Sequence, residues 1–210
     1  MSDEWYRGPR WDRDASAEFE RRLSRARDYN RPQYLRIKAL ALWQAGKLDD
    51  ACGLLLRVTA EYPDSIDAPS ATEMLGDIAR QQDRAADAES FYRAVLEIWP
   101  SRSGTTWMVE VSLAELLIYR GGESAYTEAL QLLDSRLARG LMFNNDLFRW
   151  NVALARVAVS LGDVETQRRA ARTALSLADR GPQLPRHPTV GLVNTDKRTL
   201  TWLRRLATEG

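Results

Sequence analysis

The sequence predicts an all-α protein of about four stacked helix pairs, with a capping helix at each end. Small residues recur in pairs 12 positions apart, at Ala39 and Ala51 (51 − 39) and again at Gly76 and Ala88 (88 − 76). The two pairs are themselves separated by a period of 37 residues (76 − 39). Antiparallel helices pack closely only where a side chain is small, so each pair indicates a helical hairpin. A chain of 210 residues with 44% apolar residues can bury the core that such a stack requires.

The second of these hairpins has a more detailed pattern, between Pro69 and Pro100. It reads Thr72-x2-Leu75-Gly76-x2-Ala79, Ala88-x3-Tyr92, Pro100. This stretch resembles a tetratricopeptide repeat, with Thr72 and Ala79 standing where the signature has Trp and Tyr. The resemblance implies a right-handed α-solenoid, and it implies the class of function, because such repeats are binding scaffolds.

The start of the chain combines an aromatic arm with a first helix, in a segment predicted to span 1–31. The three large rings of Trp5, Tyr6 and Trp11 are costly to leave in water, so we expect them to pack on the first helices rather than to form a partner-binding tail. Asp12 or Asp14 can cap a helix that runs to about residue 27. This helix matches neither half of a repeat, and we interpret it as an N-terminal cap.

Repeats are predicted at 32–65, 69–102, 107–140 and 147–178, with decreasing fidelity. In the first, Gly46 supplies a positive φ between the two helices, and acidic residues follow in the first turn of the second helix. In the third, the small residues Ala114 and Ala129 lie 15 apart (129 − 114), and the three extra residues are expected to lengthen the turn at 121–124. The fourth is degenerate, with Gln167 at the usual Ala position. A linker at 141–146 joins these last two repeats.

The remainder, 179–210, is predicted to be an extended Pro-rich segment followed by a capping helix. Thr195 or Asp196 caps this last helix, whose apolar stripe is Leu200, Leu203 and Leu206. The whole chain also resembles bacterial tetratricopeptide proteins with a Trp-Tyr-Arg-x-Pro-x-Trp start, here beginning at Trp5.

Composition gives no indication of catalysis, of a metal or of a cofactor. His187 is the only histidine and Cys52 the only cysteine, and no phosphate-binding glycine motif occurs. A single cysteine fits a reducing compartment, and no signal peptide or membrane span is found. We therefore expect a soluble, cytoplasmic protein that is not an enzyme; the Arg-rich composition is typical of a GC-rich bacterial genome.

The first helices of the repeats are expected to line a concave groove that binds a protein or peptide partner. The residues predicted to face it are Arg36, Trp43, Glu73, Asp77, Arg80, Glu115, Tyr119, Arg149 and Arg156. The chaperone-tail clamp of some family members requires Asn at two groove positions, and these hold Leu40 and Met74 here. The alternative interpretation is that the charged residues only form a solvated face.

A second hypothesis rests on charge. The formal net charge is only +1, yet residues 166–210 contain nine Arg or Lys and three acids, a net of +6. A basic end of this kind can contact phosphates of a nucleic acid, cap the solenoid, or dock on the acidic part of another copy.

Overall fold

The computed structural model describes residues 4–101, 103–140, 143–184 and 186–208. Over these residues the chain forms ten α-helices and one short 3₁₀-helix, η1 (Asp28–Asn30). It divides into two compact units, Met1–Val109 and Glu110–Gly210. The helices of the first unit are α1 (Arg13–Arg25), α2 (Arg31–Gln44), α3 (Leu48–Glu61), α4 (Asp67–Gln81) and α5 (Ala85–Ile98). Those that follow are α6 (Val109–Arg120), α7 (Glu123–Ala138), α8 (Asn144–Leu161), α9 (Val164–Ala178) and α10 (Lys197–Thr208).

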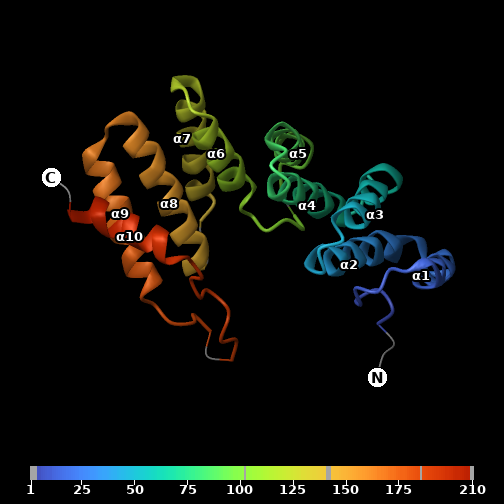
Figure 1. Cartoon of the computed structure of the whole chain (residues 1–210). Helices are drawn as coiled ribbons and strands as arrows, with labels where there is room; N and C mark the ends of the chain where they lie inside the picture. Colours follow the sequence, from blue (N-terminus) through green and yellow to red (C-terminus); the bar gives the residue numbers. More distant parts are fainter. Residues whose placement is uncertain (1–3, 102, 141–142, 185, 209–210) are drawn as a thin grey trace. The chain divides into compact units, whose positions relative to one another are not determined.

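In the first unit, α2 packs on α3 and α4 packs on α5, as two helical hairpins (Figure 1). Gly46 has a φ of 77° in the first hairpin turn, as predicted. Asp83 stands at the equivalent place one period later and takes the same left-handed conformation, with a φ of 58°. Aspartate tolerates this region better than most residues, so the second turn keeps its shape without glycine.

Gly76 lets α4 and α5 approach closely, and its main neighbour is the ring of Tyr92. A Cβ placed on Gly76 would lie 2.6 Å from Cε1 of that ring. Tyr92 is fully buried and its hydroxyl donates a hydrogen bond to Asp77 at 2.6 Å, so the ring is fixed. The close approach of α4 and α5 is confirmed, but the group nearest to Gly76 is the Tyr92 ring, whereas the spacing of small residues had pointed to Ala88.

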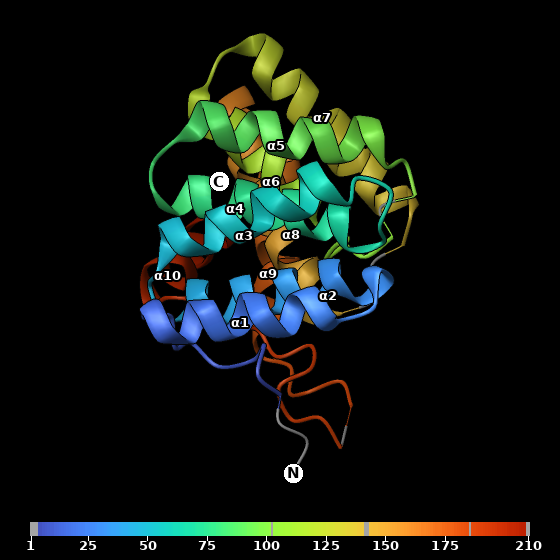
Figure 2. The same ribbon diagram turned by 90° about the vertical axis from the view of Figure 1, so that its right-hand side faces the viewer.

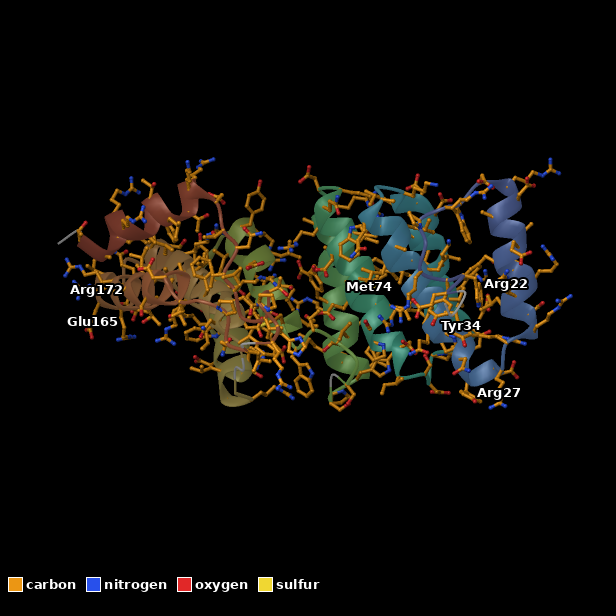
Figure 3. All side chains as sticks on the ribbon, turned by 90° about the horizontal axis from the view of Figure 1, so that it is seen from below. Arg22, Arg27, Tyr34, Met74, Glu165 and Arg172 are labelled. Atoms are coloured by element: carbon orange, nitrogen blue, oxygen red, sulfur yellow. The ribbon has the colours of Figure 1, made fainter. Side chains whose placement is uncertain are left out.

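The aromatic arm packs on the first helices, as expected. Trp5 and Trp11 both contact Phe19 of α1, and Tyr6 stacks on Tyr34 of α2 with centroids 4.6 Å apart. The ring of Tyr34, labelled in Figure 3, also lies 5.3 Å from the ring of Trp5, measured between centroids. The arm therefore packs, partly buried, against the hydrophobic core of the first unit.

Lys38 of α2 holds the aromatic arm in place through hydrogen bonds to its backbone. Its side chain is 3% exposed, and its ammonium group donates to the carbonyl oxygens of Gly8 at 2.6 Å and Arg10 at 2.9 Å. Burial lowers the Lys38 pKa from its ordinary value. The lysine crosses a largely apolar layer to satisfy backbone that has no partner in a helix.

In the second unit, α8 packs on α9, and α10 also packs on α9. Leu203 and Leu206 of α10 are buried in this core, and Asp196 caps the helix by accepting from the Thr199 backbone N–H at 2.7 Å. The final helix thus covers the last hairpin, as predicted.

Three local expectations for this half of the chain are wrong. The extra residues of the third repeat extend α7, which begins at Glu123 directly after Gly121 and Gly122, rather than lengthening the turn. Three residues are close to one helical turn, so the insertion keeps Ala129 on its buried face. The linker expected at 141–146 is shorter, because α8 already begins at Asn144; residues 141 and 142 lie outside the described part.

The third concerns the segment between α9 and α10, which turns back on itself instead of running extended. Leu184 and His187 form an isolated antiparallel bridge, and the Gln183 N–H donates to the Val190 carbonyl at 3.0 Å. The side chain of Gln183 also accepts from the Asn144 N–H at 2.5 Å, which ties the loop to the start of α8. Figure 2 shows this loop leaving and rejoining the helices.

Candidate partner-binding site

Three of the predicted groove residues meet in one pocket of the first unit. The pocket has a volume of about 370 Å³ and is lined by Trp43, Asp77, Arg80 and Gln81. Trp43 comes from α2 and the other three from α4, so the pocket joins the first helices of two successive repeats. The Trp43 indole N–H donates to Gln81 at 2.7 Å, and Asp77 accepts from Tyr92. These hydrogen bonds hold the side chains of Trp43 and Asp77 in place without a partner.

Arg36 and Glu73 are not available in the way the sequence suggested. Arg36 donates to Asp67 at 2.6 Å in a partly buried ion pair between α2 and α4. Glu73 is only 2% exposed, and its carboxylate accepts from the backbone N–H of Thr106 at 2.8 Å and from the Thr106 hydroxyl. The expectation that Glu73 faces outward is wrong, because the segment after α5 folds back over this part of α4.

In the second unit, two residues predicted for the groove bind each other. Arg149 of α8 donates two hydrogen bonds to the Glu115 carboxylate of α6, at 2.8 and 2.7 Å, and a third to the Ser112 hydroxyl at 2.9 Å. This bidentate pair joins α6 and α8, which were predicted to be the first helices of the third and fourth repeats. Beside it lies a pocket of about 390 Å³. Its lining residues are Glu115, Asn145, Phe148, Arg149, Val152, Arg156, Leu192, Val193, Asn194, Thr195 and Thr199.

Tyr119 lies outside both pockets. Its side chain is 89% exposed near the end of α6. The sequence placed it in the groove from its register on the helix alone. Its place in a partner-binding surface stays a prediction.

Sequence reasoning missed the outer face of α10. Trp202 is flanked by Arg198 and Arg205, four residues before it and three after it, and this spacing puts all three on one side of a helix. The Arg156 guanidinium of α8 lies 5.9 Å from the centre of the Trp202 ring. Two pockets, of about 460 and 570 Å³, adjoin this tryptophan. The i, i+4, i+7 spacing of Arg198, Trp202 and Arg205 is the sequence feature that could have predicted this surface.

No arrangement for metal binding emerges from residues 4–101, 103–140, 143–184 and 186–208. Within these ranges, no three His, Cys, Asp or Glu side chains are grouped to hold an ion. Burial raises the pKa of the Cys52 thiol, which keeps it protonated and weakly nucleophilic. His187 is exposed in the loop before α10. In the same described ranges, no helix is both long and apolar enough to cross a bilayer.

Comparison with known families agrees with the packing of the first unit. A sequence model described as "Tetratricopeptide repeat" matches residues 13–66 and 67–103. Residues 13–103 therefore match tetratricopeptide repeats. The match begins at Arg13, so it includes α1, which the sequence pattern set apart as a cap. Repeats of this family generally mediate protein–protein interactions and generally lack catalytic activity.

The fold extends beyond the matched residues. A crystal structure of BtubC (BKLC) from P. vanneervenii superposes with a TM-score of 0.62 at 20% sequence identity, covering 88% of this chain and 81% of that one. At this identity the likeness concerns the fold alone. No curated protein sequence matches the chain.

Proposed function

We propose that this protein is a non-catalytic scaffold that binds a peptide or helix of a partner protein against the first helices of its repeats. The observation that carries the proposal is the pocket formed by Trp43, Asp77, Arg80 and Gln81. Three of its residues were expected at a partner surface from sequence register, and two successive repeats contribute to it. A bacterial, cytoplasmic setting remains a prediction from composition.

The chemistry of this pocket suits a mixed polar and apolar segment. Trp43 offers a large, rigid anchor of the kind that supplies much of the energy of an interface. Asp77 and Arg80 provide an acceptor and a donor beside it. Because Trp43 and Asp77 are already held by hydrogen bonds, a partner pays less to order them on binding.

A displayed library of random peptides, selected on the full chain, tests the proposal. We expect the enriched peptides to lose about tenfold in affinity, or about 1.4 kcal/mol, on Trp43→Ala or Arg80→Glu. Arg27→Glu is the matched control, because it makes the same charge reversal at an exposed position outside the pocket. Substitution of Glu73 is unsuitable, since this buried carboxylate holds the segment after α5.

Two results would contradict the proposal. If the library yields no peptide that binds the folded chain, the scaffold function is wrong. If Trp43→Ala and Arg80→Glu leave every selected affinity unchanged, the pocket of the first unit is not the site.

A further inference from the structure

A continuous cationic track lies in the second unit, between α8, the segment before α10, and α10 itself. It consists of three pockets in series. The pocket beside Arg149 shares Arg156 and Thr199 with the next one, which shares Arg198 and Trp202 with the third. We refer to these three pockets together as the C-terminal track.

The charges along the track are strongly unbalanced. Its cationic residues are Arg149, Arg156, Lys197, Arg198 and Arg205, and its acidic residues are Glu115 and Asp196. Both acids have structural partners. Glu115 binds Arg149, and Asp196 caps α10 by accepting from the Thr199 N–H at 2.7 Å and its hydroxyl at 3.0 Å. The part of the track around Trp202 therefore presents positive charge to a ligand.

The Trp202 ring holds one of these cationic side chains, that of Arg156, in a defined position. The ring packs against the hydrophobic core of the second unit while remaining partly exposed, and the Arg156 guanidinium lies over it. A guanidinium held near the face of an indole by a cation–π contact can still donate its N–H groups to a ligand. Such a pair is well suited to bind a carboxylate.

The first pocket of the track is different in character. Phe148, Val152, Leu192 and Val193 contribute apolar surface there, beside the neutral side chains of Asn194 and Thr195. A nucleic-acid strand presents a phosphate at every step and would find few cations in this stretch. A polypeptide can place carboxylates near Trp202 and an apolar side chain in the first pocket.

We propose that the C-terminal track binds an acidic segment of a partner protein, with its carboxylates on Arg156, Arg198 and Lys197. This inference rests on the proposed scaffold function, for which it names a second surface and the chemistry of the segment it takes. The track lies mainly on α8 and α10 and on the segment between α9 and α10, beyond the residues that match the repeat family.

The test uses the full chain and two labelled synthetic peptides, followed by fluorescence anisotropy. One peptide consists of Glu with interspersed Leu, and its twin has Gln in place of every Glu. We expect the Glu peptide to saturate the protein and the Gln peptide to bind at least about tenfold more weakly, because its side chains offer only neutral hydrogen bonds. Added salt should lower the affinity of the Glu peptide but not that of the Gln peptide.

The variant Arg156→Glu/Arg198→Glu should weaken the Glu peptide by at least about tenfold, which corresponds to about 1.4 kcal/mol. Arg198 lies in the first turn of α10, where the helix dipole favours an anion, so this helix is expected to remain folded. The matched control is Arg168→Glu/Arg169→Glu, which changes the net charge equally in the basic end of the chain but lies outside the track. We expect the control to change the affinity by less than about twofold. Circular dichroism of both variants checks their folding.

Four outcomes would overturn the inference. If both double variants lowered the affinity for the Glu peptide equally, the peptide would be attracted to the basic region in general and not to the track. Tighter binding of a single-stranded oligonucleotide, abolished by Arg156→Glu/Arg198→Glu, would assign the track to nucleic acid. Concentration-dependent self-association lost in the same variant would assign it to a second copy. If Trp43→Ala abolished binding of the Glu peptide, the peptide would bind in the first unit. In that case the proposed scaffold function would stand, and the proposal for the C-terminal track would be wrong.

Discussion

The α4–α5 hairpin of the first unit and the α8–α9 hairpin of the second bring their helices together by different routes. Between α4 and α5, a glycine faces a buried tyrosine ring, so a flat side chain occupies the space that a Cβ would take. Between α8 and α9, the buried positions include alanines on both helices. These are Ala155 and Ala158 of α8 and Ala170, Ala171 and Ala174 of α9. Close helix packing therefore requires small groups at the crossing, and either a glycine opposite a ring or alanines on both sides can supply them.

The units also cover their outer helices differently. In the first, an irregular arm of aromatic residues packs on α1 and α2 and is fastened by Lys38. In the second, a regular amphipathic helix, α10, covers α9 with leucines, and its outer side carries Arg and Lys. Arg172 of α9, labelled in Figure 3, donates to the Ala207 carbonyl oxygen of α10 at 3.3 and 3.2 Å. An end covered by a helix retains a polar face on which a partner can bind.

Gly76→Leu tests the first route and should have the largest effect. The added side chain would collide with the Tyr92 ring, which is buried and hydrogen bonded, so we expect a loss of about 1–3 kcal/mol or more of unfolding free energy. Gly53→Leu is the control, because Gly53 lies on exposed α3 surface with nothing within 4 Å of an added Cβ. Leucine there should stabilise the helix by about 0.5–1 kcal/mol. Chemical denaturation followed by circular dichroism measures both, and equal effects would disprove the assigned packing.

Lys38→Met tests the fastening of the arm and should have an intermediate effect. The substitution keeps the apolar stem but removes the donor for two backbone carbonyls, at an expected cost of about 1–2 kcal/mol. Limited proteolysis should cut the arm faster in this variant than in Lys47→Met, whose side chain is less buried. An arm that stays equally protected would show that the aromatic contacts alone hold it.

Acid titration of the helix caps should give the smallest effect. Hydrogen bonds from the Thr199 backbone and hydroxyl lower the Asp196 pKa from its ordinary value of 3.8. A carboxylate whose pKa is lowered in the folded state stabilises the fold above the ordinary value and loses this contribution as the pH falls through the lowered one. Asp196→Asn retains a cap without a titrating group, so its unfolding free energy should fall less steeply below about pH 4.

Asp12→Asn is the corresponding variant of the first unit, since hydrogen bonds from Ala15 and Arg10 likewise lower the Asp12 pKa. Denaturation curves recorded at neutral and acid pH compare the two ends directly. An unchanged slope in both variants would indicate that the caps do not contribute to acid sensitivity.

Local sequence patterns predicted the helical hairpins and the caps of the first and last helices, but not where α7 and α8 begin. The positive φ of Gly46 depends on neighbours within one turn of the chain, and so do the caps at Asp12 and Asp196, each of which was one of two candidates. The small residue at position 76 was recognised from its 12-residue spacing to Ala88. Such features follow from backbone geometry and the shape of one side chain, so they can be recognised without knowing the rest of the fold.

The surfaces depended on contacts between distant residues. Glu73 has the register of an outward residue, yet Thr106, 33 positions later, covers it; Glu115 and Arg149, 34 positions apart, neutralise each other. Residues of α8 and α10 meet only when α10 packs back on α9, which creates the Arg156–Trp202 pair. The sequence by itself determined the turn at Gly46 and the caps of the first and last helices, because those are local steric and hydrogen-bonding requirements. Only the tertiary structure decided which charges remain open to a partner, because exposure depends on which distant segment folds over each face.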